Sequence, residues 1–238
     1  MIGLYLLLVF CFNLIQTIGA FAGTMLAMPF AILLLGAEQA RLVLTAVGLL
    51  SCIYPILRCH GRICWSEVAK TGIFMAIGIL AAQIFLDILY SPIVLLLYSL
   101  LVISVAIRNF AKSGPVNLPA AVDYLILLAA GLVHGAFLSG GSFLVIYAME
   151  HFHEKDEQRA TLSLIWLILN GSMLGMFIAQ GQYNAENLYM VGIAILPAAA
   201  GILLGDVLQN RLNEKKFRTF TNWMLILSGG VLLFNCYQ

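Results

Sequence analysis

Long apolar segments, separated by short polar gaps, run along nearly the whole chain. They lie near residues 2–20, 42–57, 68–90, 92–107, 119–137, 160–180, 187–209 and 219–236. A helix of about 20 apolar residues spans the ~30 Å hydrocarbon core of a bilayer. Because that core offers no water to satisfy backbone polar groups, segments of this kind are expected to be helical. The pattern predicts an all-α integral membrane protein.

Two further apolar segments, near 23–36 and 140–149, are shorter. They begin at Gly23-Thr24 and at Gly141-Ser142. As helices they would cover only about half to two thirds of the hydrocarbon core. Irregular backbone is tolerated at membrane depth only where it is buried in protein or lines a cavity. We therefore expect a short broken or re-entrant segment at each place.

The distribution of basic residues indicates how many segments cross the membrane. If both short segments count, ten segments result, and one side receives 11 basic residues while the other receives Arg41 alone. The larger group consists of Arg58, Arg62, Lys70, Arg108, Lys112, Lys155, Arg159, Arg211, Lys215, Lys216 and Arg218. If neither counts, the asymmetry largely disappears. Because basic residues accumulate in cytoplasmic loops, ten segments are favoured and both termini are expected outside the cytoplasm. A re-entrant pair would give the same loop assignment.

Composition supports the membrane assignment and excludes other classes. Hydrophobic residues make up 62% of the chain, charged residues make up 10%, and the mean hydropathy is +1.00. A soluble domain averages about 25% charged residues. The formal net charge of +1 gives no reason to expect a nucleic-acid partner. The N-terminal segment lacks the basic region of a signal peptide, so we interpret it as the first membrane segment.

The chain resembles itself when it is shifted by 118 residues. The matching positions are Gln16 and His134, Gly23 and Gly141, Thr24 and Ser142, and Arg41 and Arg159. We interpret the two halves, 1–111 and 119–238, as repeats of about five segments each, joined by a linker at 112–118. An odd number of segments inverts the second repeat, and inverted repeats with Gly-interrupted segments at matching positions are typical of secondary transporters. Chance similarity between apolar segments is the alternative.

The two breaks are the candidate binding site. A helix that begins near mid-membrane exposes unpaired backbone N–H groups, which attract an anion together with the helix dipole. Gly23, Gly140 and Gly141 would let a ligand approach the backbone closely. Thr24 and Ser142 would add hydroxyl donors at the same depth. The alternative is that the small residues only allow close helix packing.

Four other polar residues occupy matching places in the halves. Gln16 and His134 precede the breaks, and each is either a donor to the substrate or a partner in an interhelical hydrogen bond. Arg41 and Arg159 each begin the segment after a short one. There they could stand at the mouths of two vestibules and attract anions. Alternatively, Arg159 is only a topology signal whose charge reaches the headgroups.

The stretch EHFHEKDE, residues 150–157, contains residue types that bind metals. A metal site needs convergent ligands in a defined geometry, and this spacing specifies none, so a solvated loop is the favoured interpretation. No HExxH or GxSxG pattern is present. We expect no catalytic residue, no cofactor and no bound metal. The alternatives are a metal-ion permease that uses His134, His151 and His153, and an intramembrane enzyme that uses this acidic stretch.

The stretch GAFAGTMLAMPFAILLLG is followed by EQARLVLT, and the stretch GLVHGAFLSGGSFLVIYAM is followed by DEQRATLS. These two stretches resemble the motif of the TauE/SafE family of sulfite exporters, also called the toluene-sulfonate uptake permease family. Pro29 follows the first break, whereas Tyr147 stands at the matching place in the second. The resemblance implies movement of small sulfur-containing or organic anions across a bacterial-type inner membrane.

Together, these features predict a secondary permease that binds a small anion at mid-membrane between two Gly-interrupted half-helices. Sulfite, a related sulfur oxyanion or an organosulfonate is the expected substrate. The other expected partners are the lipid bilayer and a coupling ion, either a proton or sodium. The sequence leaves open the direction of transport and whether the protein forms a homo-oligomer.

Overall fold

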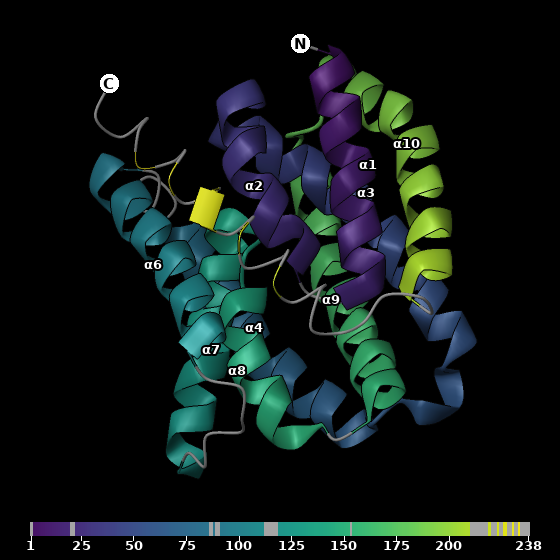
Figure 1. The fold of residues 1–238 in the computed structure, drawn as a ribbon. Helices are drawn as coiled ribbons and strands as arrows, with labels where there is room; N and C mark the ends of the chain where they lie inside the picture. The colour runs from purple at the N-terminus through teal and green to yellow at the C-terminus, as the bar shows by residue number, and fades with distance from the viewer. Residues whose placement is uncertain are drawn as a thin grey trace.

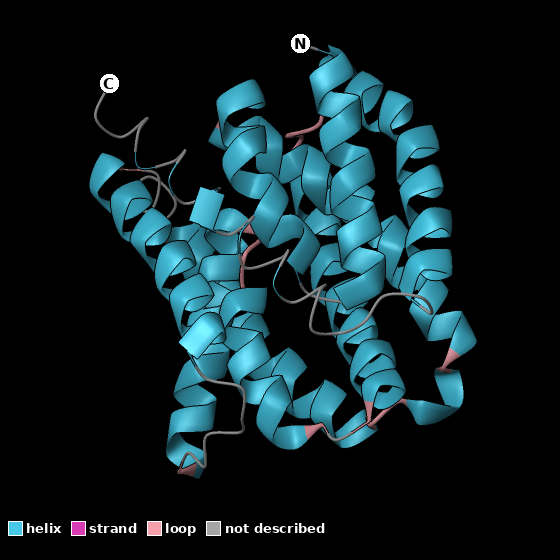
Figure 2. Cartoon of the chain, in the orientation of Figure 1, coloured by secondary structure: helices cyan, strands magenta, loops and turns pink. Residues whose placement is uncertain are grey.

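The computed structural model describes most of the chain. The described residues are 2–19, 22–85, 88, 91–111, 119–152, 154–209 and the single positions 219, 223, 226, 227, 230 and 233. In this part of the chain the regular elements are helices joined by short loops (Figure 2). The all-α prediction is therefore confirmed. The predicted linker 112–118 and most of the predicted segment 219–236 lie outside the described residues.

The helices follow the predicted apolar segments in order. They are α1 (Ile2–Gly19), α2 (Ala22–Leu35), α3 (Ala37–Arg58), the 3-10 helix η1 (His60–Arg62), α4 (Trp65–Ile84), α6 (Pro92–Ala111), α7 (Ala120–Phe137), α8 (Gly141–His151), α9 (Lys155–Ala179) and α10 (Ala185–Gln209).

Four helices begin two or more residues earlier than the apolar pattern indicated. These are α3, α4, α9 and α10, whose first turns contain Glu38, Glu67, Asp156 with Glu157, and Glu186. Acidic side chains near a helix N-terminus are favourable because of the helix dipole. Hydropathy alone does not register such polar first turns, so it placed the starts of these helices too late.

Four helices in the described part are long and apolar enough to cross a membrane: Ala37–Arg58, Trp65–Ile84, Asp156–Ala179 and Ala185–Gln209. By contrast, α2 has 14 residues and α8 has 11. At 1.5 Å per residue these helices are about 21 Å and about 17 Å long, which is shorter than a ~30 Å hydrocarbon core. Figure 1 shows that they begin near the middle of the molecule and run toward opposite ends.

The most extensive helix–helix contacts each join one helix from the first half of the chain to one from the second half. Helix α1 lies along α10, and α4 lies along α7 (Figure 1). A Cβ added to Gly78 of α4 would lie 2.7 Å from the backbone nitrogen of Leu132, and one added to Gly201 of α10 would lie 3.1 Å from that of Leu14. Small residues allow helix backbones to approach in membranes. Helices α3 and α9 pack against each other and contact α10 and α4 respectively, so they join the two pairs.

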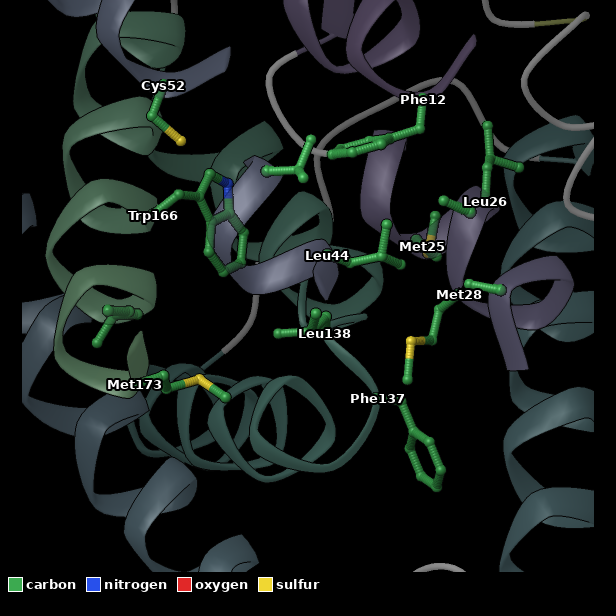
Figure 3. Close-up of a cluster of buried hydrophobic side chains, with 14 of the residues drawn as sticks. Phe12, Met25, Leu26, Met28, Leu44, Cys52, Phe137, Leu138, Trp166 and Met173 are labelled. Carbon is green, nitrogen blue, oxygen red and sulfur yellow. The ribbon is translucent and has the colours of Figure 1, made fainter. Parts of the chain in front are cut away.

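The buried core surrounds the two breaks. Figure 3 shows Met25 and Met28 of α2 beside Leu44 of α3 and Leu138 of the second break, with Trp166 of α9 on the other side. Each of these side chains is at most 3% exposed. The starts of the half-helices are therefore held by apolar packing from several helices.

Candidate functional site

The first break joins α1 to α2. The backbone N–H of Gly23 donates to Oε1 of Gln16 across 2.9 Å. A Cβ on Gly23 would lie 2.5 Å from Cβ of Gln16 and 2.6 Å from the carbonyl oxygen of Phe12. Glycine is therefore needed here because the start of α2 lies directly on α1. Gln16 satisfies one of the N–H groups that a helix start leaves without an intrahelical partner.

The second break joins α7 to α8. Leu138 ends α7 in the left-handed conformation, with φ 52°, and its N–H donates to the carbonyl oxygen of His134 across 2.8 Å. A Cβ on Gly140 would lie 2.7 Å from Cβ of His134 and would collide with the carbonyl oxygen of Ala130. Here too, glycine allows the start of the half-helix to lie against the preceding helix.

The two breaks are built alike. The residues that each glycine contacts are Phe12 and Gln16 in the first break and Ala130 and His134 in the second. These positions are related by the 118-residue shift seen in the sequence. In terms of contacts the counterpart of Gly23 is Gly140, one residue before the Gly141 that the shift pairs with it.

Of the two hydroxyl residues at the starts of α2 and α8, the structure describes the side chain of Thr24 but not that of Ser142. Thr24 is half-buried, and its Cγ2 lies 3.9 Å from the position that a Cβ on Gly48 of α3 would occupy. Ser142 is the second residue of α8, and its side chain lies outside the described part. Thr24 therefore faces α3 through its methyl group.

His134 is held between two residues of α9 that sequence reasoning missed. Its Nε2 lies 2.8 Å from Oδ1 of Asn170, and its ring centroid lies 4.7 Å from that of Trp166. Because an amide oxygen only accepts, Nε2 carries the proton in this hydrogen bond. Within the described residues, Nδ1 of His134 is buried and has no hydrogen-bond partner.

Arg41 is buried rather than standing at an open mouth. Its side chain is 2% exposed, and Nη1 donates to the carbonyl oxygen of Gly135 across 3.1 Å and to Oε1 of Gln83 across 3.0 Å. The guanidinium also lies over the ring of Phe177, 4.7 Å from its centroid. Arg41 therefore binds the C-terminal end of α7, where the helix dipole favours a cation.

Arg159 makes the matching contact in the other half. Its Nη2 donates to the carbonyl oxygen of Thr17, in the last turn of α1, across 3.0 Å. Thr17 and Gly135 are related by the same 118-residue shift as the two arginines. Each arginine therefore holds the end of the helix that precedes the break in the opposite half of the chain.

A hydrogen bond from α6 stabilises the second break. Oγ of Ser139 and the hydroxyl of Tyr98 lie 2.5 Å apart, and the Tyr98 ring stacks on Phe137 with centroids 4.4 Å apart. Both polar residues are buried. Sequence reasoning missed this pair, although Tyr98 is a polar group inside an apolar segment.

A pocket of about 420 Å³ lies away from both breaks, at the α2–α3 turn and the α9–α10 loop. Its lining includes Gly36, Glu38, Asn184 and Glu186. Two acidic side chains make this pocket a poor match for an anion. Buried apolar side chains lie between the breaks (Figure 3).

The acidic stretch at residues 150–157 is only partly a solvated loop. Glu154 is exposed and pairs with Arg62. His151, in contrast, is the last residue of α8, is half-buried and lies 3.3 Å from the carboxylate of Asp123. His153 lies outside the described residues. Among the residues that are described, no three His, Cys, Asp or Glu side chains gather as metal ligands would.

Comparison with known families identifies the chain. The family model described as sulfite exporter TauE/SafE matches residues 5–232, which is nearly the whole length. Comparisons with curated proteins and with solved structures gave no match. The chain belongs to the TauE/SafE sulfite exporter family, whose members are membrane transporters and not enzymes.

Proposed function

We propose that the protein is a secondary transporter that moves sulfite, a related sulfur oxyanion or an organosulfonate through a site between the starts of α2 and α8. The observation that carries this proposal is the pair of half-length helices, each of which has a glycine at its start packed against the preceding helix: Gly23 in the first turn of α2 and Gly140 directly before α8. Helix starts offer N–H donors and a positive dipole end to an anion. The site residues are Gly23, Thr24, Gly140, Gly141 and Ser142.

The residues around these starts would orient the backbone. The side chain of Gln16 accepts the hydrogen bond that the N–H of Gly23 can donate. An anion at the start of α2 would therefore bind to the neighbouring N–H groups of the first turn. His134 supplies a buried ring next to the second break. Arg41 and Arg159 hold the ends of α7 and α1 and add positive charge near the breaks. Binding the anion would require the apolar cluster between the breaks to open.

The crossed contacts support an inverted repeat as the scaffold of this transporter. The first helix of each half packs along the fourth helix of the other half, α1 with α10 and α7 with α4. The glycine contacts also correspond. Gly78 contacts Leu128 and Leu132 of α7, and Gly201 contacts Phe10 and Leu14 of α1. The contacted positions match at the 118-residue shift, Phe10 with Leu128 and Leu14 with Leu132. Alternating access in such folds moves one set of helices against the other around a fixed site.

The test is sulfite flux in proteoliposomes that contain the purified protein. Gly141→Val should abolish flux by filling the approach to the second break. Gly192→Val is the matched control, because nothing lies within 4 Å of a Cβ at Gly192. Normal flux through a well-folded Gly141→Val protein would remove the site, and transport of nickel or cobalt in place of sulfite would overturn the anion assignment.

A further inference from the structure

A cluster of charged residues joins the ends of three helices away from the breaks. Asp123 lies in the first turn of α7, His151 ends α8, and Glu67 lies in the first turn of α4, followed by Lys70. Nε2 of His151 lies 3.3 Å from Oδ2 of Asp123, and Nζ of Lys70 lies 3.0 Å from Oε1 of Glu67. Tyr147 connects the two pairs, because its hydroxyl donates to Glu67 and its ring stacks on His151 with centroids 4.0 Å apart.

The His151 ring makes one hydrogen bond and one ion-pair contact, and a proton on each ring nitrogen satisfies both. Nδ1 lies 3.0 Å from the carbonyl oxygen of Tyr147, and a carbonyl oxygen only accepts. Nε2 faces the carboxylate of Asp123, which also accepts. A neutral imidazole carries one proton and would turn a lone pair toward one of these oxygens. Only the imidazolium, or a proton shared between Nε2 and Oδ2, satisfies both contacts.

The charges of the surrounding residues favour the same protonation state. Glu67 and Asp123 supply two negative charges, and Lys70, over the Tyr147 ring at 5.1 Å from its centroid, supplies one positive charge. A proton on His151 makes the cluster neutral, and a neutral cluster is less costly to bury than a charged one. Helix α2, which also contacts α8, has no charged residue in its sequence.

Helix dipoles add to this preference. A cation is favoured at the C-terminal end of α8, where His151 lies, and an anion is favoured at the N-terminal end of α7, where Asp123 lies. Asp123 is 8% exposed, and among the described residues its Oδ1 is buried without a hydrogen-bond partner. The carboxylate is therefore short of donors, and protonated His151 is the donor that the structure brings to it.

We infer that Asp123 and His151 form the proton-binding site that couples a proton to the movement of α8. This inference rests on the proposed transport function, because it names the ion that is coupled to that transport. A proton from water would form the second N–H bond of the His151 ring and would return to water on release. Loss of the proton leaves a lone pair facing the carboxylate, which weakens the link between α8 and α7. The other end of α8 is the second break, about 17 Å away along the helix.

Hydrogen–deuterium exchange of α8 without substrate tests the proton site directly. After correction for the intrinsic pH dependence of exchange, the amides of residues 141–151 should exchange at least about fivefold more slowly at pH 5.5 than at pH 8. His151→Gln keeps a donor for Asp123 but does not titrate, so the difference should vanish. His60→Gln is the matched control, because His60 is exposed in η1 and lies outside the cluster. It should keep the wild-type difference.

Asp123→Asn should also remove the pH difference, because the carboxylate that attracts the proton is gone. The inference is wrong if wild-type α8 shows no pH difference, or if His151→Gln retains it.

Sulfite flux separates this inference from the transport function. Wild type and His151→Gln are compared at the same pH values, so the protonation of sulfite itself cancels. We expect flux in both proteins but a dependence on a transmembrane pH gradient only in wild type. Equal gradient dependence in both would overturn the proton site and leave transport intact. Absence of sulfite flux in wild type, with pH-dependent exchange of α8, would overturn the transport function and leave the proton site intact.

Discussion

Arg41 donates to the carbonyl oxygen of Gly135 across 3.1 Å, although the two residues are 94 positions apart in the chain. The contact crosses from one half of the chain to the other. Arg159 repeats it in reverse with Thr17. A helix that ends inside a membrane leaves carbonyl groups without intrahelical partners. The two arginines supply donors and positive charge to these ends, so they stabilise the breaks on which the proposed site depends.

Replacing Arg41 should therefore destabilise the fold. In Arg41→Gln the shorter amide cannot reach Gly135 as the guanidinium does, and a hydrogen bond to a charged group contributes about 1.5–3 kcal/mol. We expect the unfolding temperature in detergent to fall by several degrees, with a similar loss for Arg159→Gln. Arg58→Gln is the control, because the Arg58 side chain is 48% exposed and its pair with Asp206 lies at the surface.

The salt dependence of the Arg41 variant distinguishes two roles. A residue that attracts anions from solvent acts through a field that salt screens. Arg41 is buried, so its hydrogen bonds should be largely independent of salt. Thermal stability and sulfite affinity of Arg41→Gln should stay below those of wild type at both low and high salt. Convergence with wild type at high salt would instead show that Arg41 steers the substrate.

The close α4–α7 contact can be tested by replacing glycines of α4 with alanine. Gly78→Ala in α4 would place a Cβ 2.7 Å from the backbone nitrogen of Leu132, so the α4–α7 contact has to open. Overpacking of this kind costs about 1–3 kcal/mol. Gly72→Ala on the same helix has nothing within 4 Å of its Cβ and should leave stability unchanged or slightly higher.

If the two halves are inverted repeats, the α1–α10 contact should respond to substitution as the α4–α7 contact does. Gly201→Ala should destabilise the protein about as much as Gly78→Ala, whereas Gly192→Ala should not. Thermal unfolding of the four purified variants provides the comparison. Unchanged unfolding temperatures of both Gly78→Ala and Gly201→Ala would contradict the close packing of α4 on α7 and of α10 on α1.

The sequence predicted the helices and the breaks well because both depend on local signals. Apolar length marks a membrane helix, and the glycines at 23 and 140 lie where the chain turns. The 118-residue shift also paired Arg41 with Arg159, and the structure shows the two residues in matching contacts. Their partners were not predicted, because Gly135 and Thr17 are bonded through carbonyl groups that any residue carries.

Other partners were missed for a similar reason. Asn170 and Gln83 are single polar residues inside apolar segments, and that is the only signal the sequence gives. A polar residue in a membrane helix is a functional candidate, but its partner lies on another helix at a distance that periodicity does not encode. The spacing of residues 150–157 specifies no ligand geometry and so favours a solvated loop for His151, whereas its structural partner Asp123 lies 28 positions earlier in the chain.

Topology gives a prediction that is independent of the site. Both termini should lie outside the cytoplasm, because only then do the basic loops face inward. A C-terminal reporter that is active only in the cytoplasm should be silent, and a cysteine introduced at position 238 in a variant without other cysteines should react with a reagent that cannot cross the membrane. A strong cytoplasmic signal at the C-terminus would contradict the ten-segment arrangement.

The last prediction concerns His134 and Asn170. Nε2 of His134 donates to Asn170, so the ring presents Nδ1 as an acceptor when neutral and as a donor when protonated. If this ring supports anion binding, Asn170→Leu should raise the sulfite KM roughly tenfold, the effect of about one lost hydrogen bond. His134→Leu should do the same, and the double variant should be no worse than either single one, because both changes remove one contact.

Trp166→Phe is the control for this pair, because a Phe ring can still stack on His134 while leaving the Asn170 hydrogen bond in place. Its KM should stay near wild type. Initial rates of sulfite flux in proteoliposomes over a range of concentrations separate KM from the maximal rate. If Asn170→Leu and His134→Leu lower stability but leave KM unchanged, the pair is only an interhelical hydrogen bond between α7 and α9, and the anion depends on the backbone of the breaks alone.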